Sequence, residues 1–233
     1  MSDINKFKTV EFAYWLGLVQ ADCAFSRWTN KNGKCENELH MEVKSEILIK
    51  EFQKGLVFIN RFPNYFKTKR NVFTCKSPVN SVLPVLKSIN LFPKHKFIPP
   101  DFISKNKILF GAYLAGVIDG DGNVRVKRKK YPQCAIRITS DSEQVKLITL
   151  IKKFLSCSVS NAKINDERYF AKENRIIKGS WNVLEFLISS KNFIFFLNYV
   201  LPFIKLNYKK EMIENFIKKD LCAERDLNPR SQA

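Results

Sequence analysis

The sequence has few of the residues that build zinc sites. It contains two histidines and six cysteines, and no two cysteines form a C-x-x-C pair, which disfavours a zinc finger or zinc ribbon. The cysteine spacing indicates no disulfide framework either. The N-terminus lacks the apolar stretch of a secretory signal, and no apolar run reaches about 18 residues. These absences predict a soluble intracellular protein with no membrane partner.

Acidic residues are also scarce relative to basic ones. The chain has 40 Lys and Arg against 22 Asp and Glu, a formal net charge of +18. Residues 1–106 hold 17 basic and 9 acidic groups, and residues 107–233 hold 23 and 13, so the excess is shared by both parts. We expect a polyanionic partner, and nucleic acid is favoured over an anionic membrane. Charge alone leaves a ribosomal or non-specifically basic protein as an alternative.

The chain repeats itself once, which predicts two similar halves. Each half has about one hundred residues with the plan helix, strands, helix, strands, helices. The corresponding segments are EFAYWLGLVQADCAF at 11–25 with FGAYLAGVIDGDGNV at 110–124, 38–52 with 133–154, and 71–89 with 175–193.

The boundary between the halves is predicted from composition. The first half is placed at 1–96 and the second at 107–222, and the stretch FIPPDFISKN at 97–106 is predicted to be a linker because its paired prolines resist helix and central strand. Residues 223–233 have no apolar periodicity and no counterpart in either repeat, so we expect a disordered tail.

Two helices, predicted at 9–21 and 109–120, carry small residues at every fourth position. A stripe of small residues on one helix face allows two backbones to approach closely, and glycine inside a helix costs about 1 kcal/mol, so the glycines need a packing reason. We therefore expect these two helices to pack against each other. The small residues are Ala13, Gly17 and Ala21 in the first helix, and Ala112, Gly116 and Gly120 in the second.

One acid follows each stripe, Asp22 in the first half and Asp121 in the second. Packing through the stripes would bring the two carboxylates together, where they repel unless a cation lies between them. Paired oxygen ligands suit Mg²⁺ or Mn²⁺, and this arrangement is typical of metal-assisted phosphodiester hydrolysis. The alternative is that both acids merely end their helices, a position that the helix dipole disfavours.

WLGLVQADC at 15–23 and LAGVIDGDG at 114–122 resemble the two copies of the motif that names the LAGLIDADG homing endonucleases. The resemblance covers roughly residues 9–218 and implies an α+β fold of two pseudo-symmetric αββαββα halves. Each half would hold a four-stranded antiparallel sheet, and together the sheets would form a DNA-binding saddle. The first copy departs from the motif, because Gln20 replaces its first acid and Cys23 its last glycine, a residue that eases the turn into the strand.

The resemblance also implies a function. The family consists of site-specific endonucleases, often intron-encoded, that cut both strands of double-stranded DNA across the minor groove and leave 3′ overhangs. A monomer acting on a long asymmetric target would be expected, in a mitochondrion, a chloroplast or the bacterial cytoplasm. The alternative is a maturase of the same fold that binds intron RNA without cutting DNA.

Site residues follow from the resemblance by position. Asp22 and Asp121 would be the catalytic metal ligands, with the backbone carbonyls of Ala21 and Gly120 as further ligands. A basic residue from each half would lie near the scissile phosphates, and Lys96 matches this place in the first half. In the second half Asn207 stands at that place, and Lys205 and Lys209 are the nearest candidates.

The predicted DNA-binding surface consists of alternating strands after each motif. In the strand predicted at 123–130, period-two alternation sends Val124 and Val126 to the core and the basic residues outward. A solvated edge strand is the alternative. The outward residues predicted to bind DNA are Ser26, Trp28, Asn30, His40 and Glu42 in the first half, and Arg125, Lys127, Lys129, Gln133 and Arg137 in the second. Because the two sets differ, the target is predicted to be asymmetric.

Overall fold

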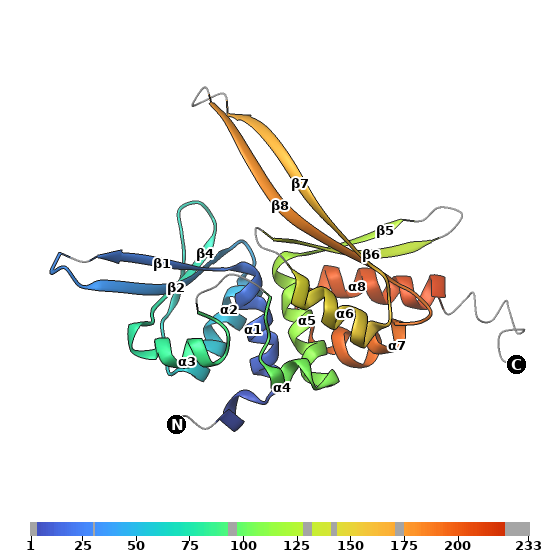
Figure 1. Cartoon of the computed structure of the whole chain (residues 1–233), viewed down its shortest axis with the longest axis horizontal. Coiled ribbons are helices and arrows are strands. Elements are labelled where there is room, and N and C mark those ends of the chain that lie inside the picture. The colour runs from blue at the N-terminus through green and yellow to red at the C-terminus, as the bar shows by residue number, and fades with distance from the viewer. Residues whose placement is uncertain are drawn as a thin grey trace, which may run out of the picture.

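The computed structural model describes residues 4–29, 31–92, 97–127, 132–140, 144–170 and 175–221 (Figure 1). The first half contains α1 (Val10–Asp22), β1 (Cys23–Thr29), β2 (Cys35–Val43), α2 (Glu46–Gly55), β3 (Tyr65–Lys67), β4 (Phe73–Pro78) and α3 (Leu83–Ser88). The second contains α5 (Lys107–Asp121), β5 (Gly122–Lys127), β6 (Gln133–Ser140), α6 (Val145–Leu155), β7 (Val159–Phe170), β8 (Arg175–Ile188), α7 (Phe193–Phe195) and α8 (Asn207–Phe216).

Both halves have the same sheet topology. The first sheet has the strand order β1-β2-β4-β3 and the second has β5-β6-β8-β7, and every neighbouring pair is antiparallel. The two sheets lie side by side above a layer of helices, with α1 and α5 at the centre (Figure 1). The predicted fold class, two αββαββα halves with four-stranded antiparallel sheets, is confirmed.

Helices α1 and α5 form the interface between the halves. Thr9 caps α1 by accepting a hydrogen bond from the backbone N–H of Phe12, and Asn106 caps α5 in the same way. Both helices are apolar around their whole circumference and buried along most of their length, as expected for helices that are covered on all sides. Their mutual contact is the most extensive between any two elements in the described part of the chain.

Two glycines allow this close approach. A Cβ atom at Gly17 would overlap the carbonyl oxygen of Tyr113, and one at Gly116 would overlap the carbonyl oxygen of Tyr14. The two contacts are related by the pseudo-two-fold axis, because Tyr14 and Gly17 correspond to Tyr113 and Gly116 in the repeat. The predicted role of the small-residue stripes is confirmed.

The strands after each motif alternate as expected. Val124, Ile136 and Ile138 are buried beneath the second sheet, whereas Arg125 and Lys127 are exposed on its outer face. On β2 the alternation is the same, with Leu39, Met41 and Val43 buried. Each sheet therefore has one face on the helices and one outer face that is free of helices.

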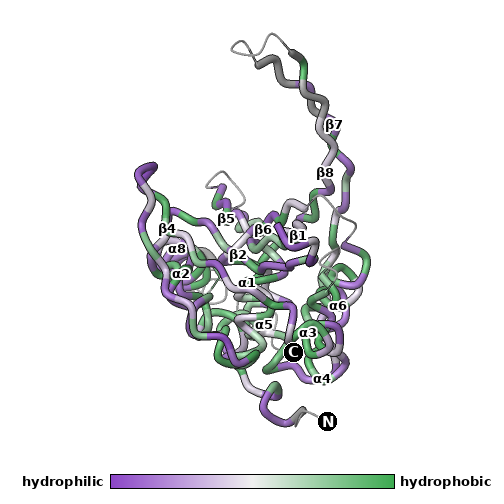
Figure 2. Tube along the Cα trace, turned by 90° about the vertical axis from the view of Figure 1, so that its left-hand side faces the viewer, coloured by the Kyte–Doolittle hydropathy of each residue, from purple (hydrophilic) through white to green (hydrophobic). Residues whose placement is uncertain are grey.

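The halves differ in their second hairpin. Strand β6 pairs with β8 only as far as Asn182, but β7 and β8 continue pairing with each other to the register Phe170 with Arg175. The result is a two-stranded ribbon that rises away from the helices and from the rest of the chain (Figures 1 and 2). The first half has no equivalent, since β3 has three residues.

Several segments bear on the predicted boundaries. Part of the predicted linker forms a short helix, α4 (Asp101–Ser104), which begins directly after the two prolines and contacts α5. The division into halves stays a prediction, and the tail at 223–233 lies outside the described residues. No helix among those described is both long and apolar enough to cross a lipid bilayer.

The Gly17 contact leads to a stability prediction. Replacing Gly17 by Ala gains about 1 kcal/mol of helix propensity, but it forces two backbones apart, and overpacking of this kind costs about 1–3 kcal/mol or more. We expect a net fall in the free energy of unfolding, measured by urea denaturation. Gly179→Ala is the control, because a Cβ there would meet only the Trp181 side chain at 3.3 Å. Equal stability of the two variants would contradict the close helix contact.

Candidate active site between the two motif helices

The two motif acids occupy the same end of the central helix pair. Helix α1 ends at Asp22 and α5 ends at Asp121, and both side chains are partly exposed. The helices are still in contact here, because a Cβ added to Gly120 would lie 2.6 Å from the Cβ of Ala21 and 3.4 Å from that of Asp22. The structure thus brings the two motif acids to one place, as predicted from the stripes.

Cys23 does not disturb the turn into the first strand. Its backbone is extended, with φ −90° and ψ 156°, and Gly122 at the equivalent place has φ −77° and ψ 134°. Neither residue uses the left-handed region that favours glycine. The first motif copy therefore makes this turn without the glycine that was expected to ease it, and Cys23 is buried there without backbone strain.

The donor set fits a hard divalent cation. Two carboxylates arrive from different helices and are open to solvent, which suits an ion that keeps several waters and takes one or two carboxylates. The described residues contain no group of three or more His, Cys, Asp and Glu side chains placed to hold a metal. Ala21 and Gly120 immediately precede the acids, and their role as carbonyl ligands stays a prediction.

Lys209 on α8 is directed at the end of α5. Its Nζ donates hydrogen bonds to the carbonyl oxygens of Ile118 (2.6 Å) and Asp119 (2.9 Å), and the residue is only 4% exposed. Burial lowers the pKa of Lys209, while attraction to Asp119, Asp121 and Asp22 opposes that shift. Lys209 is therefore a buried cation beside the motif acids, and its predicted place near the scissile phosphates stays a prediction.

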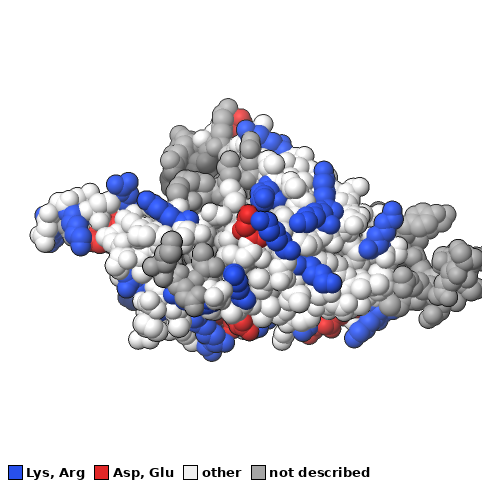
Figure 3. Space-filling model, turned by 60° about the horizontal axis from the view of Figure 1, so that its bottom comes forward, with Lys and Arg blue, Asp and Glu red and all other residues white. Residues whose placement is uncertain are grey.

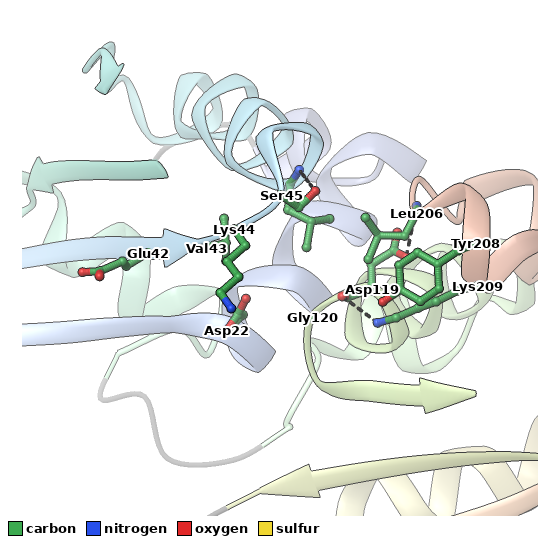
Figure 4. Close-up of a pocket in the computed structure, with 11 residues that line it drawn as sticks. Asp22, Glu42, Val43, Lys44, Ser45, Asp119, Gly120, Leu206, Tyr208 and Lys209 are labelled. Atoms are coloured by element: carbon green, nitrogen blue, oxygen red, sulfur yellow. Dashed lines mark hydrogen bonds between the residues drawn. The ribbon is translucent and has the colours of Figure 1, made fainter. Parts of the chain in front are cut away.

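A second lysine approaches from the first half. Lys44 directly follows β2, and its side chain points toward Asp22 (Figure 4). Asp22, Lys44 and Lys209 line one open pocket of about 620 Å³, together with Glu42 and Tyr208. The pocket therefore combines carboxylates with ammonium groups from both halves.

The first acid of the second motif has a structural role. Asp119 is buried, and its carboxylate accepts hydrogen bonds from the Tyr14 hydroxyl (2.8 Å) and from the backbone N–H groups of Lys205 (2.7 Å) and Leu206 (3.4 Å). Burial raises the pKa of Asp119, and these donors and Lys209 act against the shift. The Tyr14 hydroxyl comes from the other half, so this bond also ties the halves together.

Gln20 takes the equivalent place in the first half, where the backbone partners from the loop are hydrogen-bond acceptors instead of donors. The Tyr113 hydroxyl donates to its Oε1 (2.6 Å), and its Nε2 donates to the backbone carbonyls of Asn90 (3.1 Å) and Ile98 (3.4 Å). The loop of the second half offers N–H groups, which a carboxylate can accept, whereas this loop offers carbonyls, which require a donor. The departure of Gln20 from the motif is thus explained by its partners.

Most predicted DNA-binding residues lie on the outer faces of the sheets. Ser26, Trp28, His40 and Glu42 are on the outer face of the first sheet, and Gln133 and Arg137 join Arg125 and Lys127 on the second. Lys205 is exposed, with its Nζ 5.7 Å from the centre of the Tyr14 ring. Lys96, Asn30 and Lys129 lie outside the described residues.

Some site residues were missed in the sequence. Lys44 became recognisable only from the strand register, in which Cys23 pairs with Met41 and brings the end of β2 close to the motif acid. Tyr14 and Tyr113 recur at the same place in each motif helix, and their repetition marked them as a pair. The basic charge is not confined to one patch, because Figure 3 shows Lys and Arg side chains scattered among uncharged residues across one face, with acidic side chains in few places.

The fold has counterparts among solved structures. A mesophilic variant of the homing endonuclease I-DmoI matches with a TM-score of 0.52 and 16% identity, over 84% of this chain and 97% of that one. The I-SmaMI LAGLIDADG homing endonuclease bound to cleaved DNA matches with a TM-score of 0.53 and 14% identity, over 94% of this chain and 92% of that one. No protein-family model matches the chain, and no curated protein matches it in sequence.

The chain therefore has the fold of the LAGLIDADG homing endonucleases, in its single-chain form with two motif helices at the centre. At these identities the likeness establishes the fold, and the chemistry has to be argued from the residues of this chain.

The two carbonyl partners of the Gln20 amide nitrogen lead to a second prediction. Gln20→Glu keeps the size of the side chain but replaces the donor with an oxygen that faces two carbonyls, so two partly buried hydrogen bonds are lost. We expect the free energy of unfolding to fall by about 1–3 kcal/mol or more. Gln133→Glu on the exposed end of β6 makes the same charge change and is the control. A Gln20→Glu protein as stable as this control would refute the assigned partners.

Proposed function

We propose that this protein is a site-specific endonuclease of double-stranded DNA, of the homing endonuclease type, that uses Mg²⁺ or Mn²⁺ held by Asp22 and Asp121. One observation carries the proposal. The glycine contacts between α1 and α5 bring one acid from each half to the same point between the two sheets. An acid at a helix C-terminus is unfavourable with the helix dipole, so helix stability alone does not favour a carboxylate at either place.

The outer faces of the two sheets support DNA as the partner. They flank the acid pair on either side, and the second carries exposed Arg125 and Lys127. A net charge of +18 shared by both halves suits a long polyanion that contacts the whole molecule. The ribbon of β7 and β8 belongs to the second half only, so the contacts on the two sides of the cutting point differ, which supports an asymmetric target.

Each group around the acids has a defined part in the proposed reaction. The divalent cation, when bound, would polarise phosphate oxygens and stabilise the charge that develops on them. Lys44 directs an exposed ammonium group at the same place and would stabilise that charge further. Lys209 holds the carbonyl end of α5 and offsets the repulsion between the acids.

The finer features belong to the same proposal. They are cutting of both strands across the minor groove with 3′ overhangs, action as a monomer on a long target, an origin inside an intron, and residence in an organelle or in the bacterial cytoplasm. The related fold of I-SmaMI, which was solved bound to cleaved DNA, supports DNA cutting, and the other features rest on the resemblance of the two motifs. A maturase that binds intron RNA is the competing function, and the retained pair of acids favours cutting, because RNA binding needs no paired metal ligands.

The acid pair leads to the central test. Asp22→Asn and Asp121→Asn each keep the size of the side chain and remove the charge that holds the metal. We expect cleavage of a target plasmid to fall by more than the roughly 10–100-fold that loss of an outer-shell partner costs. DNA binding should persist, because affinity comes from basic groups elsewhere.

The plasmid assay also tests whether the acids share metal. With nicked, linear and uncut plasmid quantified at saturating enzyme and Mg²⁺, we expect either variant to suppress cutting of both strands, because the helices are in contact at Gly120. Clean nicking of one strand would mean that the two acids act independently. Wild-type linearisation by either variant would overturn the catalytic assignment, and a wild type that binds intron RNA but never cuts DNA would favour the maturase.

Lys44 gives a further prediction. Lys44→Met removes a solvent-exposed cation beside Asp22, so the free energy of unfolding should change by less than about 0.5 kcal/mol. Cleavage at saturating DNA should fall on the order of 10-fold or more, because charge developing on the phosphate loses a stabilising group. The control is Lys50→Met, an exposed lysine on α2 paired with Glu46 at 2.9 Å. Equal cleavage rates for the two variants would remove Lys44 from the active site.

A further inference from the structure

Each sheet carries an ion pair on its outer face. In the first sheet Lys76 Nζ on β4 lies 3.8 Å from Glu38 Oε1 on β2. In the second sheet Arg137 Nε on β6 lies 3.0 Å from Glu185 Oε2 on β8. All four side chains lie on the faces that contact no helix, and their exposed fractions range from 18% for Glu38 to 53% for Lys76.

The cation and the carboxylate are on opposite strands in the two pairs, and one member of each pair, Lys76 in the first sheet and Glu185 in the second, is at the equivalent place. Lys76 is opposite His40 across the strands, and Glu185 is opposite Arg137. The strand register makes His40 the counterpart of Arg137, because each is paired with the residue two positions after the motif acid. Glu38 lies two residues before His40. The carboxylate is therefore on β2 in the first sheet, whereas the cation is on the equivalent strand, β6, in the second.

The fold does not account for these pairs. Lys76 is exposed and the other three side chains are partly exposed, and ion pairs at a protein surface contribute little to stability, with a median of about 0–1 kcal/mol. A carboxylate on a surface that faces phosphates is also repelled by them. A glutamate at such a position becomes favourable when it accepts a hydrogen bond from a base, and in the major groove cytosine N4 is the matching donor.

A cation beside that glutamate complements the other base of the same pair. Lysine and arginine donate to O6 and N7 of guanine. Cytosine N4 and guanine O6 are hydrogen-bonded to each other, so they are about 3 Å apart. A carboxylate and a cation separated by 3.8 Å or 3.0 Å match this spacing, which means that one ion pair can contact both bases of one G·C pair.

We propose, building on the DNA-cutting function above, that Glu38 with Lys76 and Glu185 with Arg137 each recognise one G·C base pair, and that their opposite polarity places both guanines on the same DNA strand. The pseudo-two-fold axis exchanges the DNA strands between the two half-sites. If β2 and β6 carried groups of the same charge, the two guanines would lie on opposite DNA strands, as in a palindrome. Because β2 carries the carboxylate and β6 the cation, the two guanines are expected on the same DNA strand.

The test is selection of bound duplexes from a randomised DNA library without divalent metal, followed by sequencing. The selection measures binding and does not require cleavage. A protein that fails to cut DNA would count against the proposed function, but its base preference could still be read. We expect a G·C preference at one position in each half-site, with both guanines on one strand. Glu38→Gln and Glu185→Gln should each reduce the preference at one of these positions by roughly 5- to 100-fold.

A polarity swap separates recognition from general loss of affinity. The double variant Glu38→Lys with Lys76→Glu keeps the net charge and should move the preferred guanine of the first half-site to the other strand. The matched control is the swap of the exposed pair on α2, Glu46→Lys with Lys50→Glu, which should leave every base preference unchanged. Guanines on opposite strands, or a swap of Glu38 and Lys76 that leaves the preferred base in place, would overturn the proposal.

Discussion

The contact between Gly17 on α1 and the backbone of α5, together with its counterpart at Gly116, is the constraint on which the rest of the molecule depends. A helix pair that meets through backbone atoms has a narrowly defined distance and crossing, because there is no flexible side chain between the helices to adjust. The two sheets, the two acids and the pocket are all attached to the ends of these helices. Their relative positions therefore follow from one apolar contact at the centre.

Polar groups make this central contact specific. Each motif helix carries a tyrosine whose hydroxyl donates across the interface, Tyr14 to Asp119 and Tyr113 to Gln20. Both acceptors are in turn held by backbone groups of a loop in their own half. A buried network of this kind is stable only when every member has its partner, so the two halves need matched but not identical chemistry. The pair of Gln20 and Asp119 is such a case, since each suits the backbone groups that its own loop presents.

Symmetry in the fold is combined with asymmetry in the charges. The helices and sheets repeat closely, yet lysines reach the acids by different routes, Lys44 from the end of β2 and Lys209 from α8. The outer faces carry ion pairs of reversed polarity, and a long ribbon extends from the second half alone. A single chain allows this, because each half can change without altering the other, whereas a homodimer would impose the same change twice.

The sequence alone determined the duplication, the two helices that pack through small residues, the acids at their ends and the faces of the strands that follow each motif. These features are periodic and local, so spacing of 3.6 and 2 residues suffices to predict them. Only the tertiary structure decided which lysines approach the acids, since Lys209 joins them from 88 positions beyond Asp121. It also showed that the turn at position 23 forms without a glycine, and it explained why Gln20 stands in the place of an acid. Those answers depend on backbone angles and on loop carbonyls far away in the chain, for which a local pattern holds no information.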